Sequence, residues 1–270
     1  MNTSAIDTPT VLRAAEHLRA ATLSGIPVTP IRDLFAPDDL AAAYAVQAEL
    51  TRGRLADGAR IVGRKIGLTS PAVQRQLGVD RPDFGVLFAD MDLTGAAEIP
   101  SERLLQPKAE AEIAFVLGAD LAEGDLEPDR IRASVDYAVA ALEIVDSRVA
   151  DWNITITDTI ADNASSGLFV LADTRLTLDE VEPREVTMRM TVDGVEVSTG
   201  DGAACLGDPL NALAWLARTA REYGDPLRAG QIILSGALGP MAPTPPGTHV
   251  EAFIEPFGSV SATFSRKERA

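Results

Sequence analysis

The chain has 270 residues, a hydrophobic fraction of 46% and a formal net charge of −16, an ordinary composition for a globular protein apart from its acidity. The negative charge would repel phosphate backbones and anionic lipid, so it argues against a nucleic-acid or membrane partner. The one cysteine, Cys205, excludes an intramolecular disulfide, and with two histidines, His17 and His249, it leaves little for a zinc site. The N-terminal residues lack an apolar signal-peptide core, and we expect a cytoplasmic protein.

The first quarter of the chain predicts helices. Apolar residues recur at helical spacing from Val11 to Leu23, and Gly25 is a typical C-terminal stop. A second helix is expected to start near Pro37 and Asp38. We therefore expect residues 1–60 to form an N-terminal helical region that precedes a β-rich catalytic domain over residues 61–270.

The rest of the chain is dominated by patterns typical of strands. A short helix is expected after the first of them, with Ser70 as N-cap and Pro71 at the first helical position, followed by a loop over 80–85. Two further helices are expected over 129–140 and 209–223. Strands are expected over 61–68, 86–88, 107–117, 142–145, 166–171, 231–235, 250–254 and 259–264, with a hairpin over 186–197 that turns at Asp193-Gly194. Strands and helices do not alternate regularly, and no G-x-G-x-x-G or P-loop is present, so we expect an α+β fold without a nucleotide site.

Three glutamates suggest a metal site. Glu110 and Glu112 are two positions apart on a predicted strand, so their side chains point to the same side. This pair alone is equally compatible with a solvated strand face. Glu143, however, interrupts an apolar run from Val139 to Val145, and a buried carboxylate needs a partner or a cation. Three carboxylates suit Mg²⁺ or Mn²⁺ better than zinc.

Lys65 and Asp83 are candidates for proton transfer. Gly63, Lys65 and Gly67 share one face of a predicted strand, which leaves space around the amine. A confined lysine can act as an acid or base, although a lysine that extends from an edge strand to solvent fits the same pattern. Asp83 lies in a Pro/Gly-rich segment, where the local sequence favours a turn residue.

Small polar residues at two strand ends could contact a ligand. Ser165 and Ser166 precede a strand and could bind a carboxylate or satisfy the local backbone. Gly236 follows a strand, where its backbone could approach a ligand or form a plain turn.

Several segments, in order along nearly the whole chain, resemble the 2-oxopent-4-enoate (2-hydroxypenta-2,4-dienoate) hydratases and the related 4-oxalocrotonate decarboxylases of the fumarylacetoacetate hydrolase superfamily. The segments are GRKIGLTS (63–70), QLGVDRPDFGVLFADM (76–91), PKAEAEIAF (107–115), ALEIVDSR (141–148), DTIADNASSG (158–167) and LSGALGPM (234–241). The resemblance implies a mixed β-rich roll with an N-terminal helical region, assembled as a homo-oligomer. It also assigns roles: metal ligands Glu110, Glu112 and Glu143, catalytic Lys65 and Asp83, and substrate-binding Leu87, Ser165, Ser166 and Gly236.

The activity implied by the resemblance is that of a metal-dependent hydro-lyase. It would add water to 2-hydroxypenta-2,4-dienoate, or a longer alkyl homologue, to give a 4-hydroxy-2-oxo acid in the meta-cleavage degradation of aromatic compounds. A 4-oxalocrotonate decarboxylase is the first alternative, and a non-catalytic partner subunit is a more distant one. Association with a downstream aldolase or a related decarboxylase would fit the same resemblance. The superfamily's hydrolases use a His-Glu pair in an N-terminal lid. No similar motif surrounds His17, which argues against hydrolysis of acylpyruvates.

Overall fold

The computed structural model describes residues 7–36, 39–70, 74 and 81–266. Two helices form the N-terminal region, α1 (Thr8–Ser24) and α2 (Leu40–Ala56). Helix α1 ends at Gly25, whose φ of 70° is readily adopted by glycine. Helix α2 is capped by Asp39, whose side chain accepts a hydrogen bond from the Ala42 amide. Both predicted helices are confirmed.

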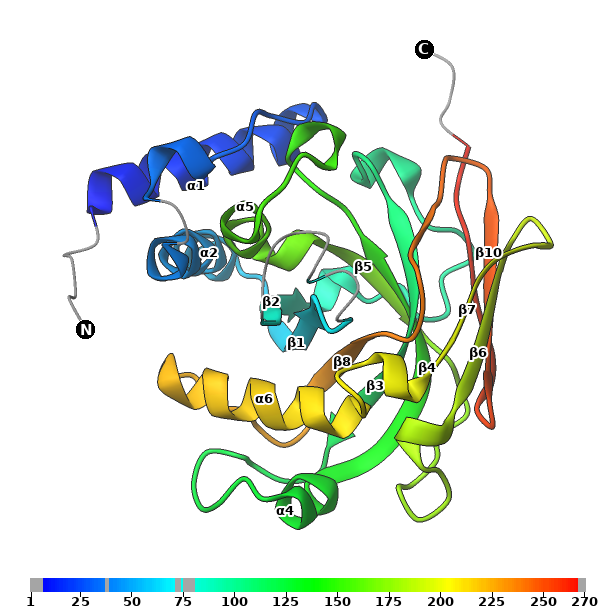
Figure 1. The fold of residues 1–270 in the computed structure, drawn as a ribbon. Coiled ribbons are helices and arrows are strands. Elements are labelled where there is room, and N and C mark those ends of the chain that lie inside the picture. Colours follow the sequence, from blue (N-terminus) through cyan, green and yellow to red (C-terminus); the bar gives the residue numbers. More distant parts are fainter. Residues whose placement is uncertain (1–6, 37–38, 71–73, 75–80, 267–270) are drawn as a thin grey trace.

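A curled mixed sheet forms the centre of the molecule (Figure 1). Its strand order is β2-β1-β8-β3-β4-β5, and the short strand β9 pairs with β3. Strand β1 runs antiparallel to β2 and parallel to β8, whereas β3 and β4 form a long antiparallel pair. The strands are β1 (Ile61–Gly67), β2 (Asp83–Phe88), β3 (Lys108–Leu117), β4 (Val135–Val145), β5 (Ser166–Leu171), β8 (Ile232–Ala237) and β9 (Ala242–Pro243).

A second, antiparallel sheet lies on the opposite side of the molecule from the N-terminal helices (Figure 1). Its order is β11-β10-β6-β7, and β11 contacts β4 and β5 of the first sheet. Strand β10 alternates buried and exposed residues, as expected for a sheet with one face in the core and one in solvent. The strands are β6 (Thr187–Val192), β7 (Val195–Asp201), β10 (His249–Glu255) and β11 (Gly258–Thr263).

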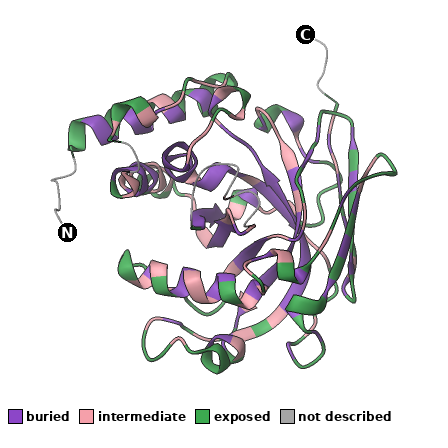
Figure 2. Cartoon of the chain, in the orientation of Figure 1, coloured by how far each residue is buried: buried purple, intermediate pink, exposed green. Residues whose placement is uncertain are grey.

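Among the described residues, three further α-helices surround the first sheet: α4 (Pro128–Ala133), α5 (Ile156–Ala161) and α6 (Pro209–Glu222). Helix α6 packs on β8 and α4, while α5 packs against α2 and β2. Buried residues concentrate in the strands of the first sheet (Figure 2) and belong to one hydrophobic cluster that runs from Val11 to Phe264. The α+β class is confirmed, while the division at residue 60 stays a prediction. No described helix is long and apolar enough to span a bilayer.

Two element assignments from the sequence are wrong. The helix expected over 129–140 ends at Ala133, and β4 begins at Val135, because an apolar run buried between β3 and β5 has no clear period. The loop expected over 80–85 is wrong from Asp83 onward, because Asp83 pairs with Gly67 in the sheet. Helix α5 was not expected at all, and the short helix expected after Ser70 lies mostly outside the described residues.

Gly63 is required by close strand packing, and its substitution tests the register of β1 against β8. A Cβ at Gly63 would lie 1.9 Å from the carbonyl oxygen of Ile232, whereas a Cβ at Gly53 in α2 would meet nothing within 4 Å. We expect Gly63→Ala to destabilise the fold by about 1–3 kcal/mol or more through overpacking. Gly53→Ala should stabilise it by about 0.5–1 kcal/mol. Urea unfolding of both variants checks this, and equal midpoints would contradict the β1–β8 register.

Candidate active site

The three predicted carboxylates come together on one face of the first sheet. Glu110 and Glu112 share a face of β3, and Glu143 on β4 is the cross-strand partner of Glu110. One ligand oxygen from each lies within 4.8 Å of the others. Glu112 and Glu143 are fully buried, and Glu110 is partly exposed. The solvated strand face considered for Glu110 and Glu112 is therefore wrong.

The polar contacts of these carboxylates leave oxygens unused. Glu112 Oε2 accepts a hydrogen bond from the Gly236 amide at 2.8 Å. Glu112 Oε1 and Glu143 Oε2 have no hydrogen-bond partner among the described residues. Buried carboxylate oxygens without donors are costly unless a cation neutralises them. Since hard divalent cations prefer such ligands, the residues fit a magnesium or manganese site.

Burial changes the acidity of this cluster. It raises the pKa of Glu112 well above the usual range, and the negative charges of Glu143 and Glu110 add to the effect. Burial also raises the pKa of Glu143 to about 7, although Lys65 opposes it. These are the values of the cation-free cluster. A bound divalent cation favours the ionised carboxylates and lowers the same pKa values.

Lys65 reaches this cluster from β1. Its ammonium nitrogen lies 3.2 Å from Glu143 Oε1 and donates a hydrogen bond to the Ala164 carbonyl at 3.0 Å. Lys65 is only 2% exposed, so the alternative in which its side chain extends from an edge strand to solvent is wrong. Burial favours the neutral amine and is the largest single influence, but the negative charges of Glu143, Asp83 and the other two glutamates together outweigh it and raise the pKa of Lys65.

Asp83 pairs with Gly67 across β2 and β1, and its carboxylate and the Lys65 ammonium both lie next to this glycine. A Cβ at Gly67 would lie 2.2 Å from Asp83 Oδ1 and 3.4 Å from Lys65 Nζ, so the space left by this glycine is occupied by the Lys65–Asp83 pair. Asp83 is a buried strand residue and not the turn residue that its local sequence favoured. Burial raises the pKa of its carboxyl, and Lys65 opposes that shift.

The residues predicted to bind substrate come from β2, from the turn and strand after α5, and from β8. Leu87 is buried on β2, four residues after Asp83 and opposite Gly63. Ser165 Oγ is 3.2 Å from Thr159 Oγ1, and Ser166 Oγ donates to the Asn163 carbonyl at 2.7 Å. These serines thus satisfy local polar groups, and their contact with substrate stays a prediction.

The two histidines and Asp146 make structural contacts. His17 is partly exposed and its ring bonds Thr29, and His249 is exposed and bonds Thr263. Asp146, next to the metal-ligand candidates in sequence, accepts hydrogen bonds from the Leu105 and Gln106 amides and fixes that loop.

Comparison with known proteins decides the family. Residues 66–265 match the family model described as fumarylacetoacetate (FAA) hydrolase C-terminal. The chain belongs to the fumarylacetoacetate hydrolase family. It is 52% identical to a 2-keto-4-pentenoate hydratase of Paraburkholderia xenovorans, over 94% of this chain and 95% of that protein. It is 37% identical to a 2-hydroxyhexa-2,4-dienoate hydratase of Comamonas testosteroni, over 93% of this chain and 96% of that protein.

A solved structure of the family has the same fold. The 4-oxalocrotonate decarboxylase of Pseudomonas putida G7, complexed with magnesium and adipate, has a TM-score of 0.90 and 35% identity. The alignment covers 95% of this chain and 97% of that one. The same enzyme has also been solved with calcium and acetate. The predicted fold, a β-rich roll of the fumarylacetoacetate hydrolase type with N-terminal helices, is confirmed.

Proposed function

We propose that this family member is a divalent-metal-dependent hydratase that adds water to 2-hydroxypenta-2,4-dienoate, or to a longer alkyl homologue. The observation that carries the proposal is the buried cluster of three glutamates beside the Lys65–Asp83 pair. It occurs in a chain that aligns along nearly its whole length with relatives named as hydratases at about half identity. The product would be a 4-hydroxy-2-oxo acid.

The chemistry follows from the positions of the side chains. Glu110, Glu112 and Glu143 would hold Mg²⁺ or Mn²⁺, which when bound supplies positive charge that stabilises negative charge on substrate oxygens. Lys65 would move a proton as the dienol becomes 2-oxopent-3-enoate: the 2-hydroxyl loses a proton and C5 gains one. The new carbonyl makes C4 electrophilic by conjugation. Asp83 would take a proton from the water that adds at C4, while C3 is protonated.

The alternative activity is decarboxylation, favoured by the likeness to the 4-oxalocrotonate decarboxylase at 35% identity. The relatives named as hydratases are more similar in sequence, so hydration is the better-supported reaction. A role as a non-catalytic partner subunit fits less well, because the glutamates and lysine are all present. We further propose a homo-oligomeric cytoplasmic enzyme of aromatic catabolism, which could associate with an aldolase or decarboxylase that handles neighbouring intermediates.

The discriminating experiment follows the ultraviolet absorbance of freshly prepared 2-hydroxypenta-2,4-dienoate with purified protein and Mg²⁺. We expect loss of the absorbance with 4-hydroxy-2-oxopentanoate as the product identified by NMR. A parallel reaction with 2-oxohex-3-enedioate measures carbon dioxide release. Release of carbon dioxide without hydration of the dienoate would replace the hydratase by the decarboxylase.

A further inference from the structure

The carbonyl that accepts the hydrogen bond of Lys65 belongs to an unusual turn. Three consecutive residues, Asn163, Ala164 and Ser165, have φ values of 54°, 52° and 51°. Residues other than glycine rarely adopt this left-handed conformation, and each such residue costs about 1–3 kcal/mol unless its surroundings enforce it. The turn connects α5 to β5 and lies against β2. The surrounding structure must therefore hold it in place.

Asn163 ties the turn to the edge of the first sheet. Its side-chain oxygen accepts a hydrogen bond from the Val86 amide at 2.7 Å, and its side-chain nitrogen donates to the Val86 carbonyl at 2.9 Å. Strand β2 is the last strand of its sheet, so this side chain takes the place of a neighbouring strand. Gly85 allows the approach, because a Cβ there would lie 2.4 Å from the Asn163 carbonyl oxygen.

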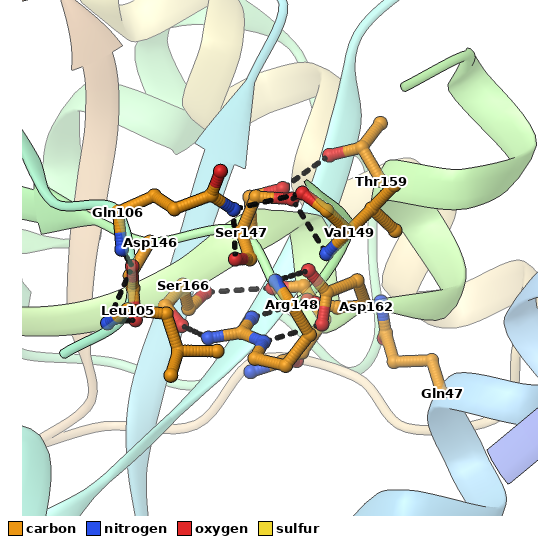
Figure 3. Close-up of polar contacts among 12 residues, drawn as sticks. Gln47, Leu105, Gln106, Asp146, Ser147, Arg148, Val149, Thr159, Asp162 and Ser166 are labelled. Atoms are coloured by element: carbon orange, nitrogen blue, oxygen red, sulfur yellow. Dashed lines mark hydrogen bonds and ion pairs between the residues drawn. The ribbon is translucent and has the colours of Figure 1, made fainter. Parts of the chain in front are cut away.

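A buried ion pair fixes the residues on both sides of the turn (Figure 3). Asp162 accepts hydrogen bonds from the side chain and the amide of Arg148, the latter at 2.9 Å. The same guanidinium donates to the carbonyls of Asp162 and Ser166, each at 2.8 Å. The turn between these residues is thus held at both ends, and its first residue, Asn163, is bonded to β2.

We propose that Asn163 is a positioning residue for Lys65, acting through the carbonyl of Ala164. A lysine side chain has four rotatable bonds, and Lys65 has close partners in Glu143 and in this carbonyl. The carboxylate alone would draw the ammonium toward the glutamates, whereas the carbonyl supplies a second, fixed acceptor. Asn163 sets where that carbonyl lies. The expected change in kcat rests on the proposed function, whereas the expected change in the position of the Lys65 ammonium does not.

Two readouts test this assignment with Asn163→Gly, which tolerates the left-handed backbone and removes only the two bonds to Val86. The first is reductive methylation of the metal-free protein, followed by mass spectrometry. The chain has three lysines, so Lys65 can be measured against Lys108 within the same sample. We expect Lys65 to be methylated several-fold faster in the variant relative to Lys108, because its ammonium is no longer confined.

The second readout is turnover of the dienoate. We expect kcat to fall by about ten- to a hundred-fold with KM little changed, because misplacement of a reacting group by about 1 Å has that effect. The matched control is Asp193→Gly. Asp193 is also a left-handed polar residue (φ 50°) whose side chain bonds a backbone amide, but it lies in the exposed β6–β7 turn. This control should keep the wild-type kcat and methylation pattern.

Each result supports or overturns the role proposed for Asn163. Wild-type methylation of Lys65 and wild-type kcat in Asn163→Gly would overturn the assignment. Loss of the folded state in Asn163→Gly, monitored by circular dichroism, would also overturn it, since the side chain would then serve stability and not position. If the wild-type protein does not hydrate the dienoate, the proposed function fails, while the methylation result still tests the role of Asn163.

Discussion

Replacement of Lys65 by methionine is expected to lower kcat by about 10²–10⁴-fold, the usual contribution of a positioned acid–base group. Methionine keeps most of the side-chain volume but removes the ammonium that lies 3.2 Å from Glu143 and bonds the Ala164 carbonyl. Steady-state kinetics with the dienoate measures the effect. Magnesium binding, measured by calorimetry, should persist because the three glutamates remain.

The matched control for this variant is Arg228→Met, which removes a cation from an exposed ion pair with Asp120. It should leave kcat unchanged, because neither residue is near the glutamate cluster. A Lys65→Met enzyme with wild-type turnover would remove the lysine from the mechanism. Loss of metal binding together with turnover would instead assign Lys65 to the architecture of the cation site.

The second large effect is expected for Glu112→Gln. Glu112 is fully buried, and its carboxylate carries one of the oxygens without a hydrogen-bond partner. Loss of its charge should weaken magnesium binding by more than the 10–100-fold typical of residues that only contact a metal ligand. Activity at limiting Mg²⁺ should fall in parallel and recover in part at high Mg²⁺. Unchanged magnesium affinity would exclude Glu112 as a ligand.

Glu112→Gln, which should weaken magnesium binding, should by contrast make the metal-free protein less sensitive to rising pH. Because burial and like charges raise the folded-state pKa of Glu112, this group favours folding at low pH. Its contribution is lost as the pH rises from the ordinary glutamate range through the raised pKa. Glu112→Gln should therefore reduce the loss of stability with rising pH in the presence of EDTA. Urea unfolding at pH 5 and pH 8 measures this, and identical pH dependence in both proteins would contradict the clustered charges.

The sequence was informative where a pattern reports directly on side-chain direction. The i, i+2 spacing of Glu110 and Glu112 placed both on one strand face, and the apolar run around Glu143 indicated a buried carboxylate. Of the two glycines that flank Lys65, Gly67 leaves the space predicted beside the amine, whereas Gly63 is packed against the backbone of Ile232. The cross-strand pairing of Glu110 with Glu143 is a matter of register between separate strands, and neither segment alone encodes it.

Other parts of the site depend on tertiary contacts. Local propensity assigned Asp83 to a turn, and only its pairing with Gly67 makes it a strand residue; the resemblance to known enzymes, not its own pattern, marked it as functional. Asn163, Asp162 and Arg148 were not predicted to act together, because their bonds join β2, the segment that follows β4 and the turn after α5. The available signal was the number of polar residues in segments 141–148 and 158–167.

The most direct test of the account measures hydration of 2-hydroxypenta-2,4-dienoate by metal-stripped protein before and after addition of Mg²⁺, with Glu112→Gln in parallel. The account predicts no absorbance loss without the cation. Addition of Mg²⁺ should restore formation of 4-hydroxy-2-oxopentanoate by the wild-type protein, with little recovery by the variant at the same Mg²⁺ concentration. Full activity of the stripped wild-type protein, or equal recovery of both proteins, would contradict a hydratase built on these glutamates.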